Sequence, residues 1–176
     1  MLLKGIFVTL LSMKLDTLDI SILEILQTEA RISNAELARR VHLSPPATLA
    51  RVQRLEKNGY IKQYAALVDR LQAGYDMLCF VNVSLQLHEL DKVTGFHEAV
   101  QEMPEVLECH HVTGEYDYLL KVVAHNTKDL ENFLVNRLTP IPGVARIHTS
   151  LVLREVKSST TIPVKNGSNP KSTQEA

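Results

Sequence analysis

Hydrophobic positions near the start of the chain recur with helical spacing. Apolar residues at positions 15, 18, 22, 25 and 26 fall on one side of a helix. Asp16 is placed to cap that helix, and Asp19 follows in its first turn, where the helix dipole favours a negative charge. The pattern therefore predicts an amphipathic helix that begins near Leu15.

Two further helices are predicted directly after the first. Ser33 with Glu36 three residues later is the pattern of a capping box, in which each side chain satisfies the other residue's backbone donor. That helix is expected to bury Leu37, Ala38 and Val41. After the turn at residues 42–44, Ser44 is the expected cap of a third helix. This helix starts at Pro45 and ends at Gly59, a glycine suited to left-handed backbone.

Two short helices joined by a tight turn, the second of them basic, are typical of a helix-turn-helix. Spacing in the third helix predicts an inner side formed by Leu49, Val52 and Leu55. The outer side is then formed by Ala47, Ala50, Arg51 and Arg54. Small residues let a helix approach base edges, and arginines reach guanine or phosphate, so this side is predicted to contact double-stranded DNA. The alternative interpretation is that Arg51 and Arg54 merely solvate an exposed face.

The second half of the chain combines strand-like alternation with helical spacing. The expected elements are a strand at 77–87, a helix at 93–103, strands at 106–113 and 116–124, a helix at 127–138 and a strand at 144–156. Gly114 and Glu115 are the expected hairpin turn, and Thr127 the expected helix cap. The order βαββαβ predicts a ferredoxin-like domain, with an antiparallel sheet and two helices on one face. The fold class is therefore α+β, with an N-terminal winged-type helix-turn-helix domain and a C-terminal ferredoxin-like domain.

These patterns predict a division into five segments. They are an N-terminal extension at 1–13, a helix-turn-helix domain at 14–62, a linker at 63–76, a ferredoxin-like domain at 77–157 and a flexible tail at 158–176. The apolar run in the extension is too short for a signal peptide. Because Met13 just precedes the first helix, the extension is interpreted as a start-site choice, or else as an added strand or oligomer contact.

Charge is distributed unevenly along the chain although the net charge is only -1. Residues 31–64 carry seven basic and two acidic side chains, a net charge of +5, whereas residues 65–176 carry ten basic and fourteen acidic ones, a net charge of -4. This asymmetry indicates that the first segment meets a polyanion. With 45% hydrophobic and 22% charged residues, the chain is neither wholly disordered nor a membrane bundle.

Other chemistry is weakly supported by the sequence. Cys79 and Cys109 are predicted to be free thiols in a reducing cytoplasm. Cys109 and His111 share one side of a strand, but two ligands are too few for a zinc site, so neither a metal nor a cofactor is expected. The chain has no phosphate-binding glycine loop and no nucleophile elbow. An enzyme is therefore the less favoured class.

Four motifs resemble the Lrp/AsnC, or feast/famine, family of transcription regulators. They lie at residues 15–19, 31–37, 43–56 and 114–121, and the similarity extends from Leu15 to Lys157. One departure is Glu115, where the family commonly has aspartate, and another is the N-terminal extension. The resemblance implies dimers formed through the ferredoxin-like domains, frequent assembly to octamers, and amino acids bound between dimers. It also implies a cytoplasmic, nucleoid-associated protein.

The resemblance also implies two sets of functional residues. The recognition-helix set is Ser44, Pro46, Ala47, Thr48, Ala50, Arg51 and Arg54. The effector set is His111, Thr113, Gly114, Glu115, Asp117, Thr127, Ser150, Leu151 and Val152. Backbone donors around a glycine turn suit an α-carboxylate, and Asp117 or Glu115 would neutralise an α-ammonium. The alternative is an ordinary hairpin glycine flanked by solvated acids.

Two functions are compatible with the sequence. The first is a sequence-specific transcription regulator whose assembly or DNA affinity responds to a free amino acid. The second is an architectural protein that compacts DNA and ignores small molecules. In either case Leu78 and Phe80 are expected to form an exposed apolar surface that a second copy of the chain would bury. This predicts a dimer or a larger homo-oligomer.

Overall fold

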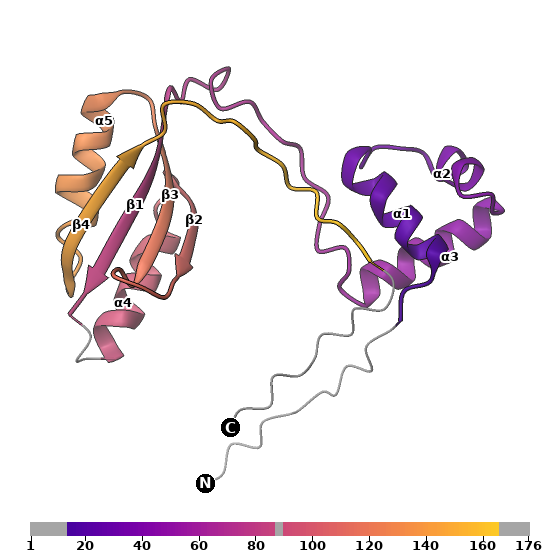
Figure 1. The fold of residues 1–176 in the computed structure, drawn as a ribbon, viewed down its shortest axis with the longest axis horizontal. Helices are drawn as coiled ribbons and strands as arrows, with labels where there is room; N and C mark the ends of the chain where they lie inside the picture. The colour runs from indigo at the N-terminus through magenta and orange to yellow at the C-terminus, as the bar shows by residue number, and fades with distance from the viewer. Residues whose placement is uncertain (1–13, 87–89, 166–176) are drawn as a thin grey trace, which may run out of the picture. The chain divides into compact units, whose positions relative to one another are not determined.

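The chain folds as two compact units in the computed structural model, which describes residues 14–86 and 90–165 (Figure 1). The first unit contains the described residues up to Ala66 together with those from Ser158 onward, and the second is Leu67–Lys157. The predicted extension at 1–13 lies outside the described residues. Each unit has its own hydrophobic core.

The first unit contains the three predicted helices, α1 (Thr17–Thr28), α2 (Asn34–Arg40) and α3 (Pro45–Lys57). They close around a small core formed by Ile22, Leu23, Leu37, Val41 and Leu55. Asp16 caps α1 as predicted: its carboxylate accepts a hydrogen bond from the Asp19 N–H, and the Asp19 carboxylate accepts one from the Asp16 N–H. The reciprocal capping box thus lies at α1.

Helices α2 and α3 have the predicted N-terminal caps, with one difference at α2. Ser33 accepts from the Glu36 N–H, but the Glu36 carboxylate binds Arg39 and Arg40 rather than returning to Ser33. The reciprocal box expected at α2 is therefore wrong, because two neighbouring guanidinium groups attract the carboxylate more strongly than one amide. Ser44 caps α3, as predicted.

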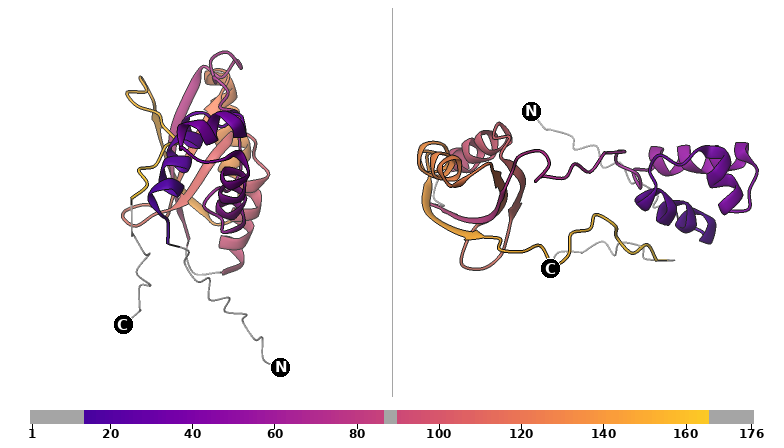
Figure 2. Two further views of the ribbon diagram at one scale, coloured as in Figure 1. Left: turned by 90° about the vertical axis from the view of Figure 1, so that its right-hand side faces the viewer. Right: turned by 90° about the horizontal axis from the view of Figure 1, so that it is seen from above.

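The second unit is an antiparallel sheet covered by helices on one face (Figure 2). Its elements are β1 (Met77–Leu85), α4 (Leu90–Gln101), β2 (Val106–His111), β3 (Tyr118–Ala124), α5 (Thr127–Asn132), its π-helical continuation η1 (Phe133–Leu138) and β4 (Val144–Leu151). The strand order is β2-β3-β1-β4, and every paired strand is antiparallel. The predicted ferredoxin-like topology is confirmed.

The two faces of the sheet differ in their cover. Alternate residues of β1 and β3, such as Val81 and Leu120, pack with Phe96 and Phe133 in the core. The other set points to the opposite, open face, where the side chain of Phe80 is 39% exposed. Leu78 was also expected to be exposed, but it is buried within the chain, so that expectation is wrong.

Several predicted boundaries differ by a few residues. The hairpin between β2 and β3 is a six-residue loop at 112–117 rather than a two-residue turn, because pairing stops at His111 and Tyr118. Asn126, not Thr127, caps α5 by accepting from the Asp129 N–H. The last strand ends at Leu151, well before the predicted residue 156.

Residues 158–165 of the C-terminal segment contact the helix-turn-helix unit. In the described part, the backbone of Ile162 exchanges two hydrogen bonds with the Gln27 side chain of α1. Val164 packs against the apolar core of the helix-turn-helix unit. The described part of the predicted tail therefore contacts an amide side chain and an apolar surface that are far away in sequence.

Candidate functional site

Helix α3 buries Leu55 and packs Val52 against the core as expected, but Thr48 takes the inward place that was assigned to Leu49. Thr48 and Leu55 are fully buried, and the Thr48 hydroxyl donates to the Ser44 carbonyl. The polar Thr48 side chain can be buried because this local hydrogen bond satisfies its hydroxyl. Thr48, expected among the DNA-contacting residues, therefore does not lie on the surface of the helix.

Arg51 and Arg54 point from α3 toward the start of α1. The Arg51 Nη1 lies 2.7 Å from both Asp16 Oδ2 and Asp19 Oδ1. The Arg54 Nη2 lies 2.8 Å from each carboxylate oxygen of Asp19. Asp19 is fully buried, so two guanidinium groups and the backbone cap compensate one buried negative charge.

Arg54 is exposed as predicted and Arg51 is half-buried, and both belong to this ion-pair network. The side chain of Arg51 is 24% exposed and that of Arg54 45% exposed. Burial alone would raise the pKa of the Asp16 carboxyl, but hydrogen bonds from the Asp19 backbone and from Arg51 outweigh it and lower the pKa below its usual value. Neither arginine solvates a free face, and each joins α3 to α1.

The outward side of α3 is formed mostly by residues other than Arg51 and Arg54. Its exposed residues at helical spacing are Pro46, Leu49, Ala50, Gln53 and Lys57, with Ser44 and Ala47 also exposed at the N-terminal end. Leu49 was assigned to the inner side but is 46% exposed. Gln53 was not among the DNA-contacting residues predicted from the sequence. Centring the helical spacing on Thr48 and Leu55, rather than on Leu49, would have placed Gln53 outward.

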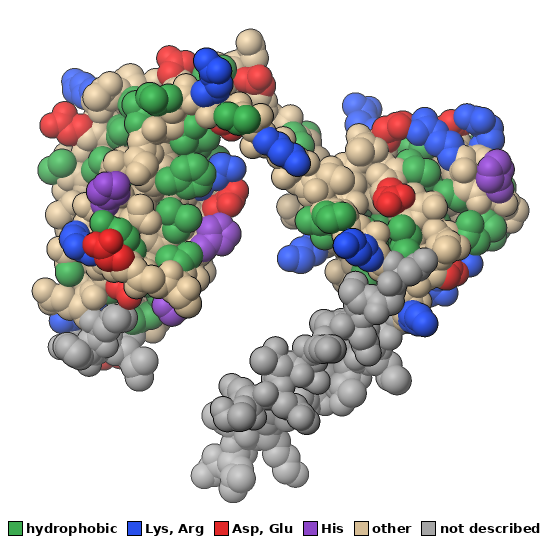
Figure 3. All heavy atoms as spheres, in the orientation of Figure 1, with side chains coloured by type: hydrophobic (Ala, Val, Ile, Leu, Met, Phe, Trp, Pro, Cys, Tyr) green, Lys and Arg blue, Asp and Glu red, His purple; other side chains and the backbone are tan. Residues whose placement is uncertain are grey.

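Ion pairs also reduce the charge available to a polyanion. Over residues 14–64, eight basic side chains stand against six acidic ones, a net charge of +2. Arg39 and Arg40 pair with Glu36, and Arg40 also pairs with Glu29. Acidic and basic side chains accordingly lie side by side on this unit (Figure 3). The net charge of +5 counted from residue 31 omitted the pairing acids that precede it.

The loop at 112–117 is built around a glycine in a backbone conformation that other residues rarely adopt. Gly114 has a φ of 126°, although a Cβ there would meet no atom within 4 Å. Glycine is therefore required by the backbone angle rather than by crowding. Asp117 fixes the end of the loop, because its N–H donates to the Val83 carbonyl and its carboxylate accepts from the Leu85 N–H at 2.7 Å.

Four consecutive backbone donors remain available in this loop. Within the described residues, no hydrogen bond uses the N–H groups of Thr113, Gly114, Glu115 or Tyr116. Successive unpaired N–H groups around a positive-φ residue form a concavity that suits an anion. The described Asp117 carboxylate, by contrast, already has a backbone partner.

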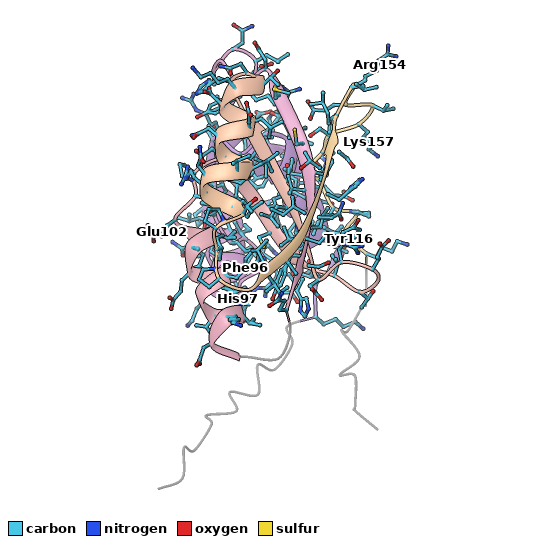
Figure 4. The ribbon with its side chains drawn as sticks, turned by 90° about the vertical axis from the view of Figure 1, so that its left-hand side faces the viewer. Phe96, His97, Glu102, Tyr116, Arg154 and Lys157 are labelled. Carbon is cyan, nitrogen blue, oxygen red and sulfur yellow. The ribbon has the colours of Figure 1, made fainter. Side chains whose placement is uncertain are left out.

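Aromatic and charged side chains surround this loop. Glu115 pairs with Arg146 of β4 at 2.9 Å, and the Arg146 guanidinium lies 4.7 Å from the centre of the Tyr116 ring. His111 stacks on Tyr118, whose hydroxyl lies 2.7 Å from His97 Nε2 on α4. Figure 4 labels Tyr116 in the loop and His97 on the helix. The loop is thus supported by β3, β4 and α4.

The predicted effector residues fall into two groups that lie apart on the sheet. His111, Thr113, Gly114, Glu115 and Asp117 lie at the end where β1 finishes and β3 begins. Thr127 lies beyond the other end of β3, after Ala124, whereas Ser150, Leu151 and Val152 pair with Phe80, Cys79 and Leu78 of β1. The length of β3, about 20 Å, therefore separates Thr127 from the loop, and Ser150 lies about 10 Å along the sheet from the Val83 row that Asp117 contacts. One copy of the chain does not bring them together.

Other kinds of site find no support in the described part of the chain. It contains no group of three His, Cys, Asp or Glu side chains arranged to hold a metal ion. Burial raises the pKa of the Cys79 and Cys109 thiols. Among the helices described, none is long and apolar enough to span a membrane.

Comparison with known proteins gives consistent matches over both units. The profile of the Lrp/AsnC ligand binding domain matches residues 78–162, and that of a winged helix-turn-helix DNA-binding domain matches residues 15–62. The leucine-responsive regulatory protein of Escherichia coli K12 is 40% identical over 151 residues, which cover 86% of this chain and 92% of that protein.

Solved structures give the same result. A transcriptional regulator of Neisseria meningitidis in complex with L-Met superposes with a TM-score of 0.82 at 38% identity, covering 85% of this chain and 96% of that one. LrpC of B. subtilis superposes with a TM-score of 0.75 at 32% identity, covering 84% of this chain and all of that one.

Proposed function

Because this chain belongs to the Lrp/AsnC family of DNA-binding transcription regulators, which are not enzymes, we propose that a free amino acid bound by its second unit changes its assembly or its affinity for DNA. The helix-turn-helix unit supplies the DNA-binding half of this function. The ligand binding domain supplies the half that senses the amino acid. Sensing would begin at the loop of residues 112–117 in the second unit.

The observation that carries the proposal is the row of free backbone donors at residues 113–116. An amino acid needs an anion site for its α-carboxylate and a cation site for its α-ammonium a few ångströms apart. The N–H groups around Gly114 suit the carboxylate, and the half-buried carboxylate of Asp117 or that of Glu115 suits the ammonium. Neither carboxylate is buried without a partner, so the empty loop is not destabilised by lone charge.

The two separated groups of effector residues support a site shared between copies of the chain. The loop of one copy would meet Thr127 and residues 150–152 of another, since a single copy holds these groups apart on its sheet. Ligand binding would then be linked to assembly, because the complete site exists only in the oligomer. Octamers built from dimers would contain such contacts.

The open face of the sheet supports dimer formation. It is not covered by α4 or α5, and Phe80 stands on it near Leu119, Lys121 and Ser150. A second copy placed against this face would cover the exposed aromatic ring. This would place the two recognition helices on half-sites about one helical turn apart, or a multiple of that distance.

Methionine and leucine are the first effectors to test. One relative is described as leucine-responsive, and another was solved with L-Met. In this chain, Thr127 and Ser150 add polar groups that a purely aliphatic pocket would lack. Exclusive leucine specificity is therefore not expected.

Calorimetry with the twenty free amino acids tests this proposal. We expect at least one amino acid to bind the wild-type chain. Gly114→Ala strains a backbone that holds φ at 126°, at a cost of about 1 to 3 kcal/mol, and should weaken that binding about 5- to 150-fold.

The matched control is Gly95→Ala, since Gly95 lies in α4 without a positive φ and with open space at its Cβ. It should leave the affinity unchanged. Equal binding by wild type and Gly114→Ala would place the ligand elsewhere. If no amino acid binds the wild-type chain, the architectural alternative is favoured.

A further inference from the structure

The surface that helix α3 offers to DNA is a stripe of five residues, the reading face. It consists of Pro46, Leu49, Ala50, Gln53 and Lys57, all exposed. Thr48 and Leu55 are fully buried on the opposite side of the helix. Because the members recur at helical spacing, they line one side of the helix over its whole length. An α-helix inserted into the major groove meets the bases with such a stripe.

The two arginines of α3 are already engaged. Arg51 binds Asp16 and Asp19, and Arg54 binds both oxygens of Asp19. If both arginines turned to DNA, the fully buried carboxylate of Asp19 would lose its cationic partners. Reading bases with these arginines would therefore oppose the packing of α1 on α3.

Gln53 and Leu49 have the chemistry to read bases in their place. The Gln53 amide offers a donor and an acceptor, which match N7 and the N6 amino group of adenine, and no described residue hydrogen-bonds to it. The apolar side chain of Leu49 suits the methyl group of thymine. Ala50 between them is small enough to let the helix backbone approach.

The spacing of the two side chains fits base pairs about two steps apart. Leu49 and Gln53 are four residues apart, a rise of about 6 Å along the helix axis. Base pairs are stacked about 3.4 Å apart, so the two residues reach positions about two steps from each other. Lys57, one turn further on, suits a backbone phosphate.

We infer that Gln53 and Leu49 are the specificity-determining residues of α3, and that they read A·T base pairs in the major groove. This inference deepens the assignment of the first unit as a DNA-binding domain. Arg51 and Arg54 instead hold α1 against α3 through Asp19. They contribute to DNA binding indirectly, because they stabilise the unit that carries α3.

The test starts with the full-length wild-type chain and a pool of duplexes carrying a randomised segment. The selected duplex is then titrated with wild type, Gln53→Ala and Leu49→Ala. We expect each variant to lose about 5- to 150-fold in affinity for this duplex and little for random DNA. Gln63→Ala is the matched control, because Gln63 is also exposed but lies after α3.

Base analogues identify the contact that is lost. Replacing adenine by 7-deazaadenine removes N7, and replacing thymine by uracil removes the methyl group. The first change should weaken wild type but not Gln53→Ala, and the second should weaken wild type but not Leu49→Ala.

Two results would overturn the inference. The first is wild-type affinity and an unchanged selected sequence in both variants, which would show that other residues read the bases. The second is a wild-type chain that binds DNA without selecting any sequence. A wild-type chain that binds no DNA at all would contradict the function of the first unit as well.

Discussion

Asp19→Ala should destabilise the helix-turn-helix unit by about 2 to 4 kcal/mol. Asp19 is fully buried and accepts hydrogen bonds from Arg51, Arg54 and the Asp16 backbone. Its removal leaves two guanidinium groups without their common partner. It also removes the hydrogen bond that the Asp19 carboxylate accepts in the α1 capping box. Because both arginines reach solvent in part, the effect should stay below that of stranding a fully buried charge.

Hydrogen exchange of the α1 and α3 amides measures this loss within the first unit, which urea unfolding of a two-unit chain would not isolate. Glu24→Ala is the control, since Glu24 is exposed on the same helix. Protection of α1 and α3 that stays equal to wild type in Asp19→Ala would refute the stabilising role of the network.

Phe80→Arg should weaken self-association at least about 30-fold, the factor that corresponds to the loss of about 2 kcal/mol at an interface hot spot. Phe80 is exposed on the open face of the sheet, and a charge placed there would lose its water on association. Sedimentation at several concentrations measures the change. The variant should also bind a two-half-site duplex more weakly, because the paired recognition helices would separate.

Val135→Arg is the control for this substitution. Val135 is also an exposed apolar residue, but it lies in η1, on the helical side of the second unit. It should leave the dimer intact. Dissociation of Val135→Arg together with an unchanged Phe80→Arg would assign the dimer contact to the helical side.

Local patterns were sufficient to predict most elements. Helical spacing identified α1, α2 and α3, and the alternation of β1 identified a strand with one buried side. Caps such as Asp16 and Ser44 were recognisable because they act on backbone groups only three residues away. Hydrophobic periodicity and capping are properties of short segments, so the sequence expresses them directly.

Long-range partners account for the incorrect predictions. The ion pair of Arg51 depends on Asp16, which lies 35 residues earlier. Thr48 is buried because a local hydroxyl bond offsets its polarity, which a hydrophobic pattern does not express. For the same reason, the pattern placed Leu49 inward and did not single out Gln53.

The effector residues were recognised by resemblance, but their arrangement was not. The predicted strand at 116–124 already separates Gly114 from Thr127, but the position of residues 150–152 beside Phe80, Cys79 and Leu78 depends on the pairing of β4 with β1. A site that contains both groups would therefore need more than one copy of the chain.

A single titration tests the central proposal, that a free amino acid controls DNA binding by this regulator. The selected duplex is titrated with the wild-type chain alone and with each of the twenty amino acids at saturating concentration. We expect at least one amino acid to change the Kd for DNA about 5- to 150-fold, and DNA to change the affinity for that amino acid by the same factor. If every amino acid leaves both the DNA affinity and the oligomeric state unchanged, the proposal is contradicted and the chain is an architectural DNA-binding protein.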